Sequence, residues 1–455
     1  MRVVRLGGAF LFFVLGGMLA AGAASAGQDQ LAVNTAINGP VLTFDWPAVQ
    51  IGIGSYEEGP TGLTIFRFPN RVSAAVDVRG GGPGTINTDI LRLGYDNRFV
   101  DAIVFAGGSD YGEEATTAVM TALVDDGTHN GEYDKVAFAA GAIIYDLSDH
   151  RLNSIYPDKR LAQAALHDLR SGVFPLGAQG AGRSATQGTL FDCGTYSGQG
   201  GAFRQIGETK IATFTIVNAL GAVTDREGRI VRCHRDPAWG NVVFTSELLA
   251  HVSAHPAALP SGPSSHTTIS LVVTNRQMTV AELQRLAVVV HTSMARGIQP
   301  YSTPWDGDTL YAVSTQEVAG DDKSLSMDGL DIAASEAMWD AILASVPDAP
   351  AFNPSAAVAV PTERLQALAG RYRFSRDAVI EISIQNGKAM LRALGQSYLD
   401  LKSEPVALTP MSPTEFYVES RYGTRMAFTL GAEGKATAAT INPGRWAMHG
   451  DRIAD

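Results

Sequence analysis

The hydrophobic pattern of this chain changes at a Pro/Ala-rich segment, residues 346–361, and the change predicts two domains of different class. Before the segment, short β-branched runs alternate with stretches of helical spacing, which is typical of layered α/β proteins. After it, apolar and polar residues alternate, and Asn386-Gly387 separates two such runs as in a β-hairpin. We therefore expect an α/β domain in residues 27–345, an extended linker, and a small antiparallel β domain in residues 362–455.

The first domain contains short apolar runs that predict strands covered on both faces of a sheet. These runs are Leu63–Phe68, Ala74–Val78, Ala102–Phe105, Ile211–Val217 and Ile269–Val273. Helical spacing predicts a helix over Val280–Gly297, with Gly297 as its stop, and a second helix over Ser335–Val346, with Ser335 as its N-cap. The expected layering is therefore helices on sheets.

The N-terminus predicts a secretory signal peptide over residues 1–26. Two arginines precede the apolar run Leu6–Ala21, and Ala24–Ala26 offers small residues for cleavage before Gly27. A membrane anchor is the alternative, but the run is short and has no stop-transfer pattern. We expect a periplasmic or secreted protein that does not span the membrane.

The charge and the cysteines narrow the classes of partner. The formal charge of −11 becomes −13 without the two arginines of the signal peptide, so nucleic acid is not an expected partner. Cys193 and Cys233 could pair in an oxidising compartment, or remain apart. Two isolated cysteines do not complete a zinc site, and the glycine-rich segments lack the spacing of nucleotide-binding loops. We expect neither a metal nor another cofactor.

Two glycine-rich segments of the first domain could approach a ligand closely through their backbone. Gly81 and Gly82 lie in the first of them, and Tyr111 lies in the second, Gly107–Gly112. We take these three residues as candidates for substrate binding. The alternative is that both segments are tight connecting turns.

A pair of adjacent threonines is a candidate source of a catalytic nucleophile. Thr267 and Thr268 open a strand-like run, and Asp306-Gly307-Asp308-Thr309 follows downstream. A threonine hydroxyl needs a base, and a chain cut just before Thr267 would supply one as its new α-amine. The alternative is an ordinary buried strand with threonine at its mouth.

Several dispersed segments, taken together in order, resemble a known family. They are Tyr56–Gly62, Ala75–Gly81, Tyr156–Lys159, Gly198–Gly200, His266–Ser270, Gly297–Pro300 and Asp306–Thr309. The resemblance is to the self-processing L-aminopeptidase/D-esterase and β-peptidyl aminopeptidase family. Within that family, the nylon-oligomer hydrolase (6-aminohexanoate-oligomer endohydrolase) branch is the most similar, over residues 43–345.

The resemblance implies an N-terminal-nucleophile-like αββα sandwich, made as one precursor and cut between His266 and Thr267. The two resulting chains would stay associated, and the protein would form a homo-oligomer. Thr267 would act as nucleophile, with its free α-amine as general base.

By match to the family, Asp306 and Asp308 form an acidic pair that orients the amine and the hydroxyl, and we expect both on one face of one strand. Asn218 would stabilise the oxyanion, and Tyr145 would hold the substrate or the oxyanion. A loop corner for the aspartates, and strand-end caps for the other two, are the alternatives.

Two positions depart from the nylon-hydrolase branch. Thr189, also a candidate for substrate binding, stands where the branch has a lysine, and His266 stands where it has an asparagine. Arg183 is a candidate to replace the lost charge. His291, in the helix after the cut, is a candidate for pH-sensitive chemistry or a packed core histidine.

We therefore expect a hydrolase of amide bonds in short peptides, β-peptides or ω-amino-acid oligomers. One alternative is an acyltransferase of the ornithine acetyltransferase type on the same scaffold. Another is an uncut, inactive homologue that acts as a binding protein through its C-terminal domain. That domain is similar to the lipocalin-like domain appended to some β-lactamase-like hydrolases.

Overall fold

The computed structural model describes most of the chain. The described residues are 28–95, 99–129, 136–147, 151–191, 194–232, 244–254, 266–320, 324–346, 357–375, 378–394, 403–418, 424–442 and 447–454. The expected signal peptide, Cys193, Cys233 and most of the linker lie outside these residues, so what was expected of them stays a prediction.

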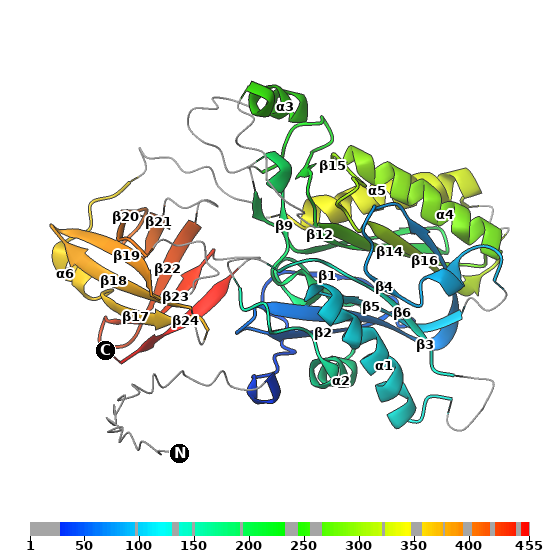
Figure 1. Ribbon diagram of the computed structural model, residues 1–455, viewed down its shortest axis with the longest axis horizontal. Helices are drawn as coiled ribbons and strands as arrows, with labels where there is room; N and C mark the ends of the chain where they lie inside the picture. Colours follow the sequence, from blue (N-terminus) through cyan, green and yellow to red (C-terminus); the bar gives the residue numbers. More distant parts are fainter. Residues whose placement is uncertain are drawn as a thin grey trace, which may run out of the picture. The chain divides into compact units, whose positions relative to one another are not determined.

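A long strand, β3 (Thr61–Val78), joins the two sheet layers of the α/β domain (Figure 1). Its first part pairs with β2 (Gln50–Tyr56) and β5 (Phe99–Ala106), and its last residues pair with β16 (Thr309–Val318). From β16 the sheet continues through β14 (Thr267–Arg276), which is parallel to it. The other strands of this sheet are β12 (Thr209–Asn218), β11 (Gln199–Ile206), β6 (Ala139–Ile143), β4 (Thr85–Ile86) and β7 (Arg170–Ser171).

β3 merges two strands that the sequence predicts separately, Leu63–Phe68 and Ala74–Val78. Its pairing with β5 shifts in register between Arg67 and Val72. The exposed Pro69 lies in this interval, where a residue without an N–H group is tolerated because the ladder is already interrupted. The irregularity lets one strand serve both layers.

Helices on the outer faces complete an αββα sandwich (Figure 1). α1 (Glu114–Asp125) and α2 (Lys159–His167) cover the layer of β2, β5 and β6. α4 (Val280–Ser293) and α5 (Met327–Ala344) cover the layer of β11, β12, β16 and the end of β3. The expected fold class is confirmed.

The two faces of the sheet layer that contains β14 pack into different cores. Between the sheets lies an aromatic cluster that includes Phe66 and Phe214, whose ring centroids are 4.9 Å apart. Ile269 and Leu271 of β14 join this cluster, whereas Val272 points to the helices α4 and α5. Full burial of such side chains contributes about 1.5–3 kcal/mol each. β14 is therefore held firmly on both sides.

The helix ends follow local capping. α4 starts at a capping box formed by Thr279 and Glu282, and Gly297 ends the short 3₁₀ turn that follows the helix. The expected start of α5 at Ser335 is wrong. Ser326 is the N-cap, because its side chain accepts from the N–H group of Gly329, and Ser335 lies on the buried face inside the helix.

The C-terminal domain is a closed barrel of eight antiparallel strands, each paired with the next along the chain. Its elements are α6 (Thr362–Gln366), β17 (Gly370–Arg373), β18 (Val379–Gln385), β19 (Lys388–Leu394), β20 (Val406–Pro410), β21 (Glu415–Val418), β22 (Thr424–Leu430), β23 (Ala436–Ile441) and β24 (Met448–Ile453). The hairpin at Asn386 and Gly387 is confirmed, with φ of 51° and 75°. Buried side chains such as Tyr372, Phe416 and Met426 pack together in its core.

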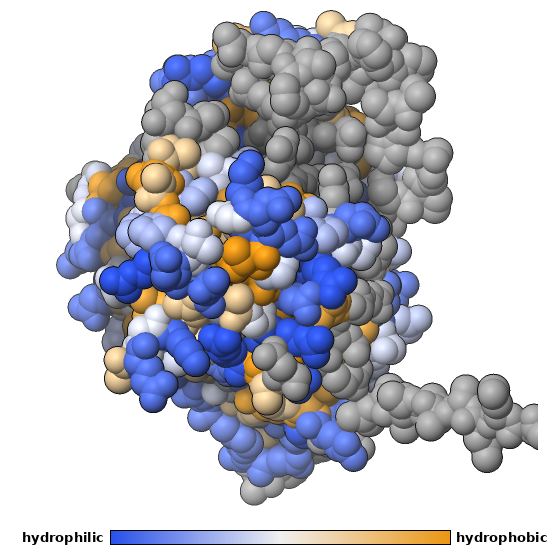
Figure 2. Space-filling view, turned by 90° about the vertical axis from the view of Figure 1, so that its left-hand side faces the viewer, coloured by the Kyte–Doolittle hydropathy of each residue, from blue (hydrophilic) through white to orange (hydrophobic). Residues whose placement is uncertain are grey.

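Short elements complete the α/β domain. They are β1 (Val41–Thr43), β8 (Val173–Pro175), β9 (Thr186–Gln187), β10 (Thr195–Tyr196), β13 (Ala222–Val223), β15 (Ile298–Gln299), α3 (Thr245–Ala254) and several 3₁₀ turns. In Figure 2, hydrophilic and hydrophobic residues are interspersed over the visible face. Over the described part of the chain, no helix is both long and apolar enough to cross a bilayer.

Candidate active site

Thr267 is the first residue of β14 and lies beside the end of β12, where Asn218 is its cross-strand partner. The Thr267 side chain is buried, and its Oγ1 donates a hydrogen bond of 2.6 Å to the carbonyl oxygen of His266. The hydroxyl therefore lies against the carbonyl group of the peptide bond that precedes it.

A second donor reaches the same carbonyl oxygen. The backbone N–H group of Gly307 donates to His266 O over 2.7 Å. Two donors on one carbonyl oxygen polarise the group. The Gly307 N–H group would still donate to this oxygen while the Thr267 hydroxyl attacks, and it would stabilise the negative charge that develops there. Glycine is required at 307, because a Cβ atom would come within 2.7 Å of Thr267 Oγ1 and 2.8 Å of Gly82 O.

Asp308 supports the strand that carries the threonine. Its Oδ1 accepts from the N–H group of Thr268 over 2.6 Å, and its Oδ2 accepts from the N–H group of Ser302 over 2.9 Å. Burial, together with the nearby charge of Asp306, raises the pKa of Asp308 to about 8. These hydrogen bonds oppose the rise without cancelling it.

Asp306 holds a different part of the site. Its Oδ2 accepts from the N–H and hydroxyl groups of Thr303, over 2.9 and 2.6 Å, and its Oδ1 accepts from the N–H group of Leu220 over 3.4 Å. Both aspartates precede β16, which starts at Thr309, so the expectation that they share a strand face is wrong. In the loop before β16, each carboxylate accepts from backbone N–H groups, and Asp306 forms an isolated bridge with His266.

Both the oxygen and the nitrogen of the Asn218 amide make a hydrogen bond in this structure. Its Oδ1 accepts from the N–H group of Thr186 over 3.1 Å, and its Nδ2 donates to the carbonyl oxygen of Tyr145 over 2.8 Å. Tyr145 thus reaches Asn218 through its backbone, and its side chain is half-buried. The structure brings Asn218 beside Thr267, as the sequence suggested, and fixes its orientation.

Comparison with known proteins identifies the family. The model of peptidase family S58 matches residues 43–356. The chain belongs to peptidase family S58. It is 41% identical over 313 residues to the 6-aminohexanoate-oligomer endohydrolase of Paenarthrobacter ureafaciens, which covers 67% of this chain and 85% of that protein. It is also 34% identical over 270 residues to an uncharacterized aminopeptidase of Mycobacterium tuberculosis, over 57% of this chain and 74% of that protein.

Solved structures also match this S58 peptidase. The β-aminopeptidase of a Burkholderia species aligns with a TM-score of 0.48 and 18% identity, over 69% of this chain and 89% of that chain. The L-aminopeptidase D-Ala-esterase/amidase of Ochrobactrum anthropi aligns with the same TM-score and identity, over 69% and 88%. The assignment rests on the sequence match, which shows that the protein is a hydrolase of amide bonds.

The two departures from the nylon-hydrolase pattern lie together in this S58 hydrolase. Thr189 Oγ1 is 2.7 Å from Nε2 of His266, in a contact that the sequence did not indicate. Arg183, considered as a replacement for the missing lysine, is paired with Glu57 instead, with its Nη2 2.6 Å from Glu57 Oε2. Its guanidinium charge is thus already balanced by a carboxylate.

The glycine segment packs against the loop that carries the acidic pair. The N–H groups of Gly81 and Gly82 donate to Thr303 O over 3.2 Å and to Asp306 O over 2.9 Å. Gly81 thus supports the loop. Tyr111 lies in η3 (Ser109–Glu113), where its exposed ring packs 5.8 Å from that of Tyr156.

Some residues of the site carried no signal in the sequence. Gly307 was only a spacer between two aspartates, and Ser302 and Thr303 belonged to no motif. Their roles come from backbone geometry, which a residue pattern does not encode. Among the described residues, no group of three or more His, Cys, Asp or Glu side chains gathers as a metal site would.

Proposed function

We propose that this S58 hydrolase cuts its own chain between His266 and Thr267 and then uses Thr267 as an N-terminal nucleophile. One observation carries the proposal. Thr267 Oγ1 and the Gly307 N–H group both contact the carbonyl oxygen of His266, at 2.6 and 2.7 Å. The attacking group and an oxyanion donor are therefore already beside the bond to be cut.

The cut follows as an acyl shift and a hydrolysis. Thr267 Oγ1 attacks the carbonyl carbon of His266, and the hydroxyl proton passes to the Thr267 nitrogen as the C–N bond breaks. Water then hydrolyses the ester, which leaves a carboxylate on His266 and a free α-amine on Thr267. A free α-amine has a pKa near 8 and serves as the general base for the next substrate.

The two chains are proposed to stay associated after the cut, because the smaller one supplies central strands. β14 and β16 follow the cut, and they lie between β12 and β3, which precede it. Separation of the chains would break two strand ladders and two buried cores. We also propose a homo-oligomer and an exported protein, on the family resemblance and on the signal-like N-terminus respectively.

The favoured substrates are linear amides of ω-amino acids, such as 6-aminohexanoate oligomers. The 41% identity to the 6-aminohexanoate-oligomer endohydrolase supports this class. Short peptides and β-peptides are the other candidate substrates, and their hydrolysis rates should be compared with that of 6-aminohexanoate oligomers. Acyl transfer to an added amine, if faster than hydrolysis, would reassign the enzyme to the acyltransferases.

Intact-mass analysis of the purified protein tests the cut. We expect two fragments, one that ends at His266 and one that begins at Thr267, and we expect Thr267→Ala to remain uncut and inactive on amides. Thr267→Ser, which keeps the hydroxyl, should still be cut. A wild-type chain that stays intact after long incubation would refute the proposal, and cutting in Thr267→Ala would move the nucleophile elsewhere.

A further inference from the structure

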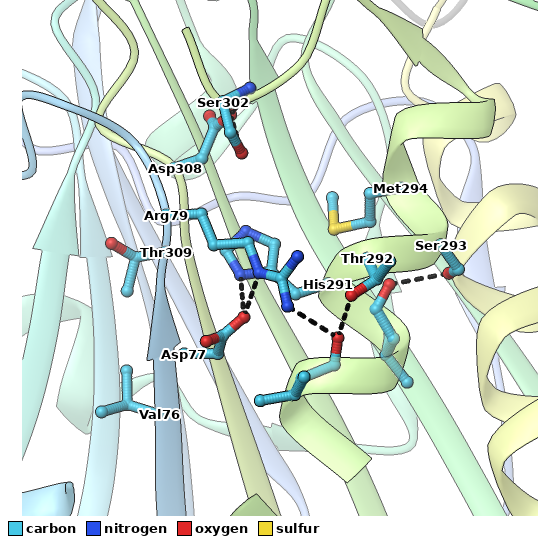
Figure 3. Close-up of polar contacts among 12 residues, drawn as sticks. Val76, Asp77, Arg79, His291, Thr292, Ser293, Met294, Ser302, Asp308 and Thr309 are labelled. Atoms are coloured by element: carbon cyan, nitrogen blue, oxygen red, sulfur yellow. Dashed lines mark hydrogen bonds and ion pairs between the residues drawn. The ribbon is translucent and has the colours of Figure 1, made fainter. Parts of the chain in front are cut away.

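A polar network lies between α4 and the end of β3, beside an apolar cluster (Figure 3). His291 is fully buried, and its Nδ1 lies 2.9 Å from Asp77 Oδ2. The same oxygen accepts from Arg79 Nε over 2.5 Å, and Arg79 Nη2 donates to Val288 O over 3.2 Å. Only the imidazole is fully buried, because the side chains of Asp77 and Arg79 are partly exposed. The pair with Asp77 offsets the cost of burying a polar group at position 291.

The protonation of the network follows from its contacts. Asp77 accepts, so Nδ1 of His291 carries the proton, and Nε2 is buried with no hydrogen-bond partner among the described residues. Burial lowers the pKa of His291, although Asp77 opposes this effect. Burial alone would raise the pKa of Asp77, but hydrogen bonds from His291 and Arg79 lower it. The imidazole is thus neutral and Arg79 balances the charge of Asp77.

The network is connected to the loop of Asp306 and Asp308 through the two residues that follow β3. The N–H groups of Arg79 and Gly80 both donate to the carbonyl oxygen of Asp308, over 3.0 and 3.2 Å. The Arg79 side chain, which Asp77 and α4 hold, therefore fixes the segment on which Asp308 rests. Asp308 in turn accepts from the N–H group of Thr268, next to the nucleophile.

Among the described residues, the groups that act on the His291 imidazole lie at the end of β3, just after it, and in the loop before β16. Asp77 of β3 and Arg79, which follows β3, act on the imidazole, and the ring of Tyr301 packs edge-on to it with centroids 5.6 Å apart. Asp306 and Asp308 act on Tyr301, whose pKa burial and these carboxylates raise. The imidazole therefore reaches the loop of the acidic pair only through Tyr301 and Arg79, and the Thr267 hydroxyl points to the opposite face of the sheet.

We propose that His291 is a positioning residue, which acts through Asp77 and Arg79 to hold the loop of Gly307 and Asp308 in register with Thr267. This proposal rests on the proposed self-cleavage. α4 and the loop follow the cut, whereas Asp77 and Arg79 precede it. The network thus also joins the two fragments, and it would keep this register in the cut enzyme.

Two amide substitutions at position 291 test the proposal, because they place the same donor group at different distances from the backbone. His291→Asn places an amide donor near the position of Nδ1 and keeps the hydrogen bond to Asp77, whereas His291→Gln carries its amide toward the position of Nε2. A misplacement of about 1 Å costs on the order of 10²-fold in rate. We expect His291→Gln to slow self-cleavage by at least ~10-fold. In the cut enzyme, it should lower kcat by at least ~10-fold and leave KM little changed. We expect His291→Asn to stay within ~3-fold of wild type.

The surface pair His167–Asp126 supplies a matched control, because its His Nε2–Asp Oδ1 distance is 3.2 Å and both side chains are exposed. His167→Gln should leave both rates unchanged. Asp77→Asn combined with His291→Gln should cost no more than the worse single change, since both act in one path.

The outcomes separate this proposal from the proposed function. If wild type remains uncut, the self-cleavage proposal fails. If wild type is cut and folded His291→Gln, checked by circular dichroism, is cut as fast as His291→Asn, the positioning role of His291 is overturned and the self-cleavage proposal stands. Additive losses in the double variant would also overturn it.

Discussion

The Thr189 hydroxyl lies 2.7 Å from Nε2 of His266, so the two positions that depart from the nylon-hydrolase pattern contact each other. A lysine at position 189 would place a cation against this imidazole, whereas a hydroxyl can donate to it or accept from it. The contact thus couples the residue before the cut to the residue that replaces the lysine. Both departures therefore lie at one contact beside the junction.

Loss of this contact should slow self-cleavage. Thr189→Val keeps the shape of the side chain but removes the hydroxyl, and a hydrogen bond of this kind contributes about 1 kcal/mol. We expect a rate about 5-fold lower, because 1.4 kcal/mol corresponds to a factor of ten. A time course of fragment formation after cell-free synthesis measures it. Thr189→Ser keeps the hydroxyl and should be cut normally, and equal rates for the two variants would contradict a role for the contact.

Gly307→Ala should nearly abolish self-cleavage. The added Cβ would come within 2.7 Å of Thr267 Oγ1, so either the hydroxyl or the loop must move, and the N–H donor to His266 O would move with it. Loss of an oxyanion donor costs about 10²- to 10³-fold in rate. Gly82→Ala is the matched control, because a Cβ there meets no atom within 4 Å, and its self-cleavage should be close to wild type.

The sequence predicted the layered α/β class and the antiparallel C-terminal strands because the hydrophobic period encodes them directly. It split β3 in two, since Pro69 resembles a strand end unless the register shift is seen. It placed the start of α5 at Ser335, because serine is a common N-cap residue, but this serine is buried inside the helix.

The sequence predicted which residues belong to the site, but not the contacts that they make. Thr267, Asn218 and the aspartates follow from dispersed motifs, but the donor role of Gly307 is a backbone property without a sequence signal. The partnership of His291 with Asp77 joins residues 214 positions apart, and no local pattern reports such a contact.

The pH dependence of self-cleavage should show an inflection near pH 8. Burial and the charge of Asp306 raise the pKa of Asp308 to about 8, so its carboxyl group keeps a proton at neutral pH and loses it as the pH rises. The ionised form accepts the hydrogen bonds from Thr268 and Ser302 more strongly, which steadies the nucleophile strand. We therefore expect the first-order rate to rise between about pH 7 and pH 9.

Asp308→Asn tests the assignment of that inflection. The amide cannot ionise, so the step near pH 8 should flatten, and its NH₂ group would leave a buried N–H donor of Thr268 or Ser302 without an acceptor, at a cost of about 1–3 kcal/mol in stability. Rates measured by mass spectrometry from pH 5 to 10 and unfolding midpoints by circular dichroism give both readouts. An unchanged inflection in this variant would assign it to another group.

The two fragments should behave as one particle after the cut. β14 pairs with β12 on one side, β16 pairs with β3 on the other, and the ring of Trp339 in the smaller fragment packs 4.8 Å from the guanidinium of Arg226 in the larger one. Native gel filtration should therefore show both fragments in a single peak at 1 M salt, since ladders and apolar cores are insensitive to screening. Arg226→Ala should leave the peak intact because exposed ion pairs contribute little. Two separate peaks at 1 M salt without denaturant would contradict this prediction. They would show that charged surface contacts, which salt screens, hold the fragments together instead of the shared sheet.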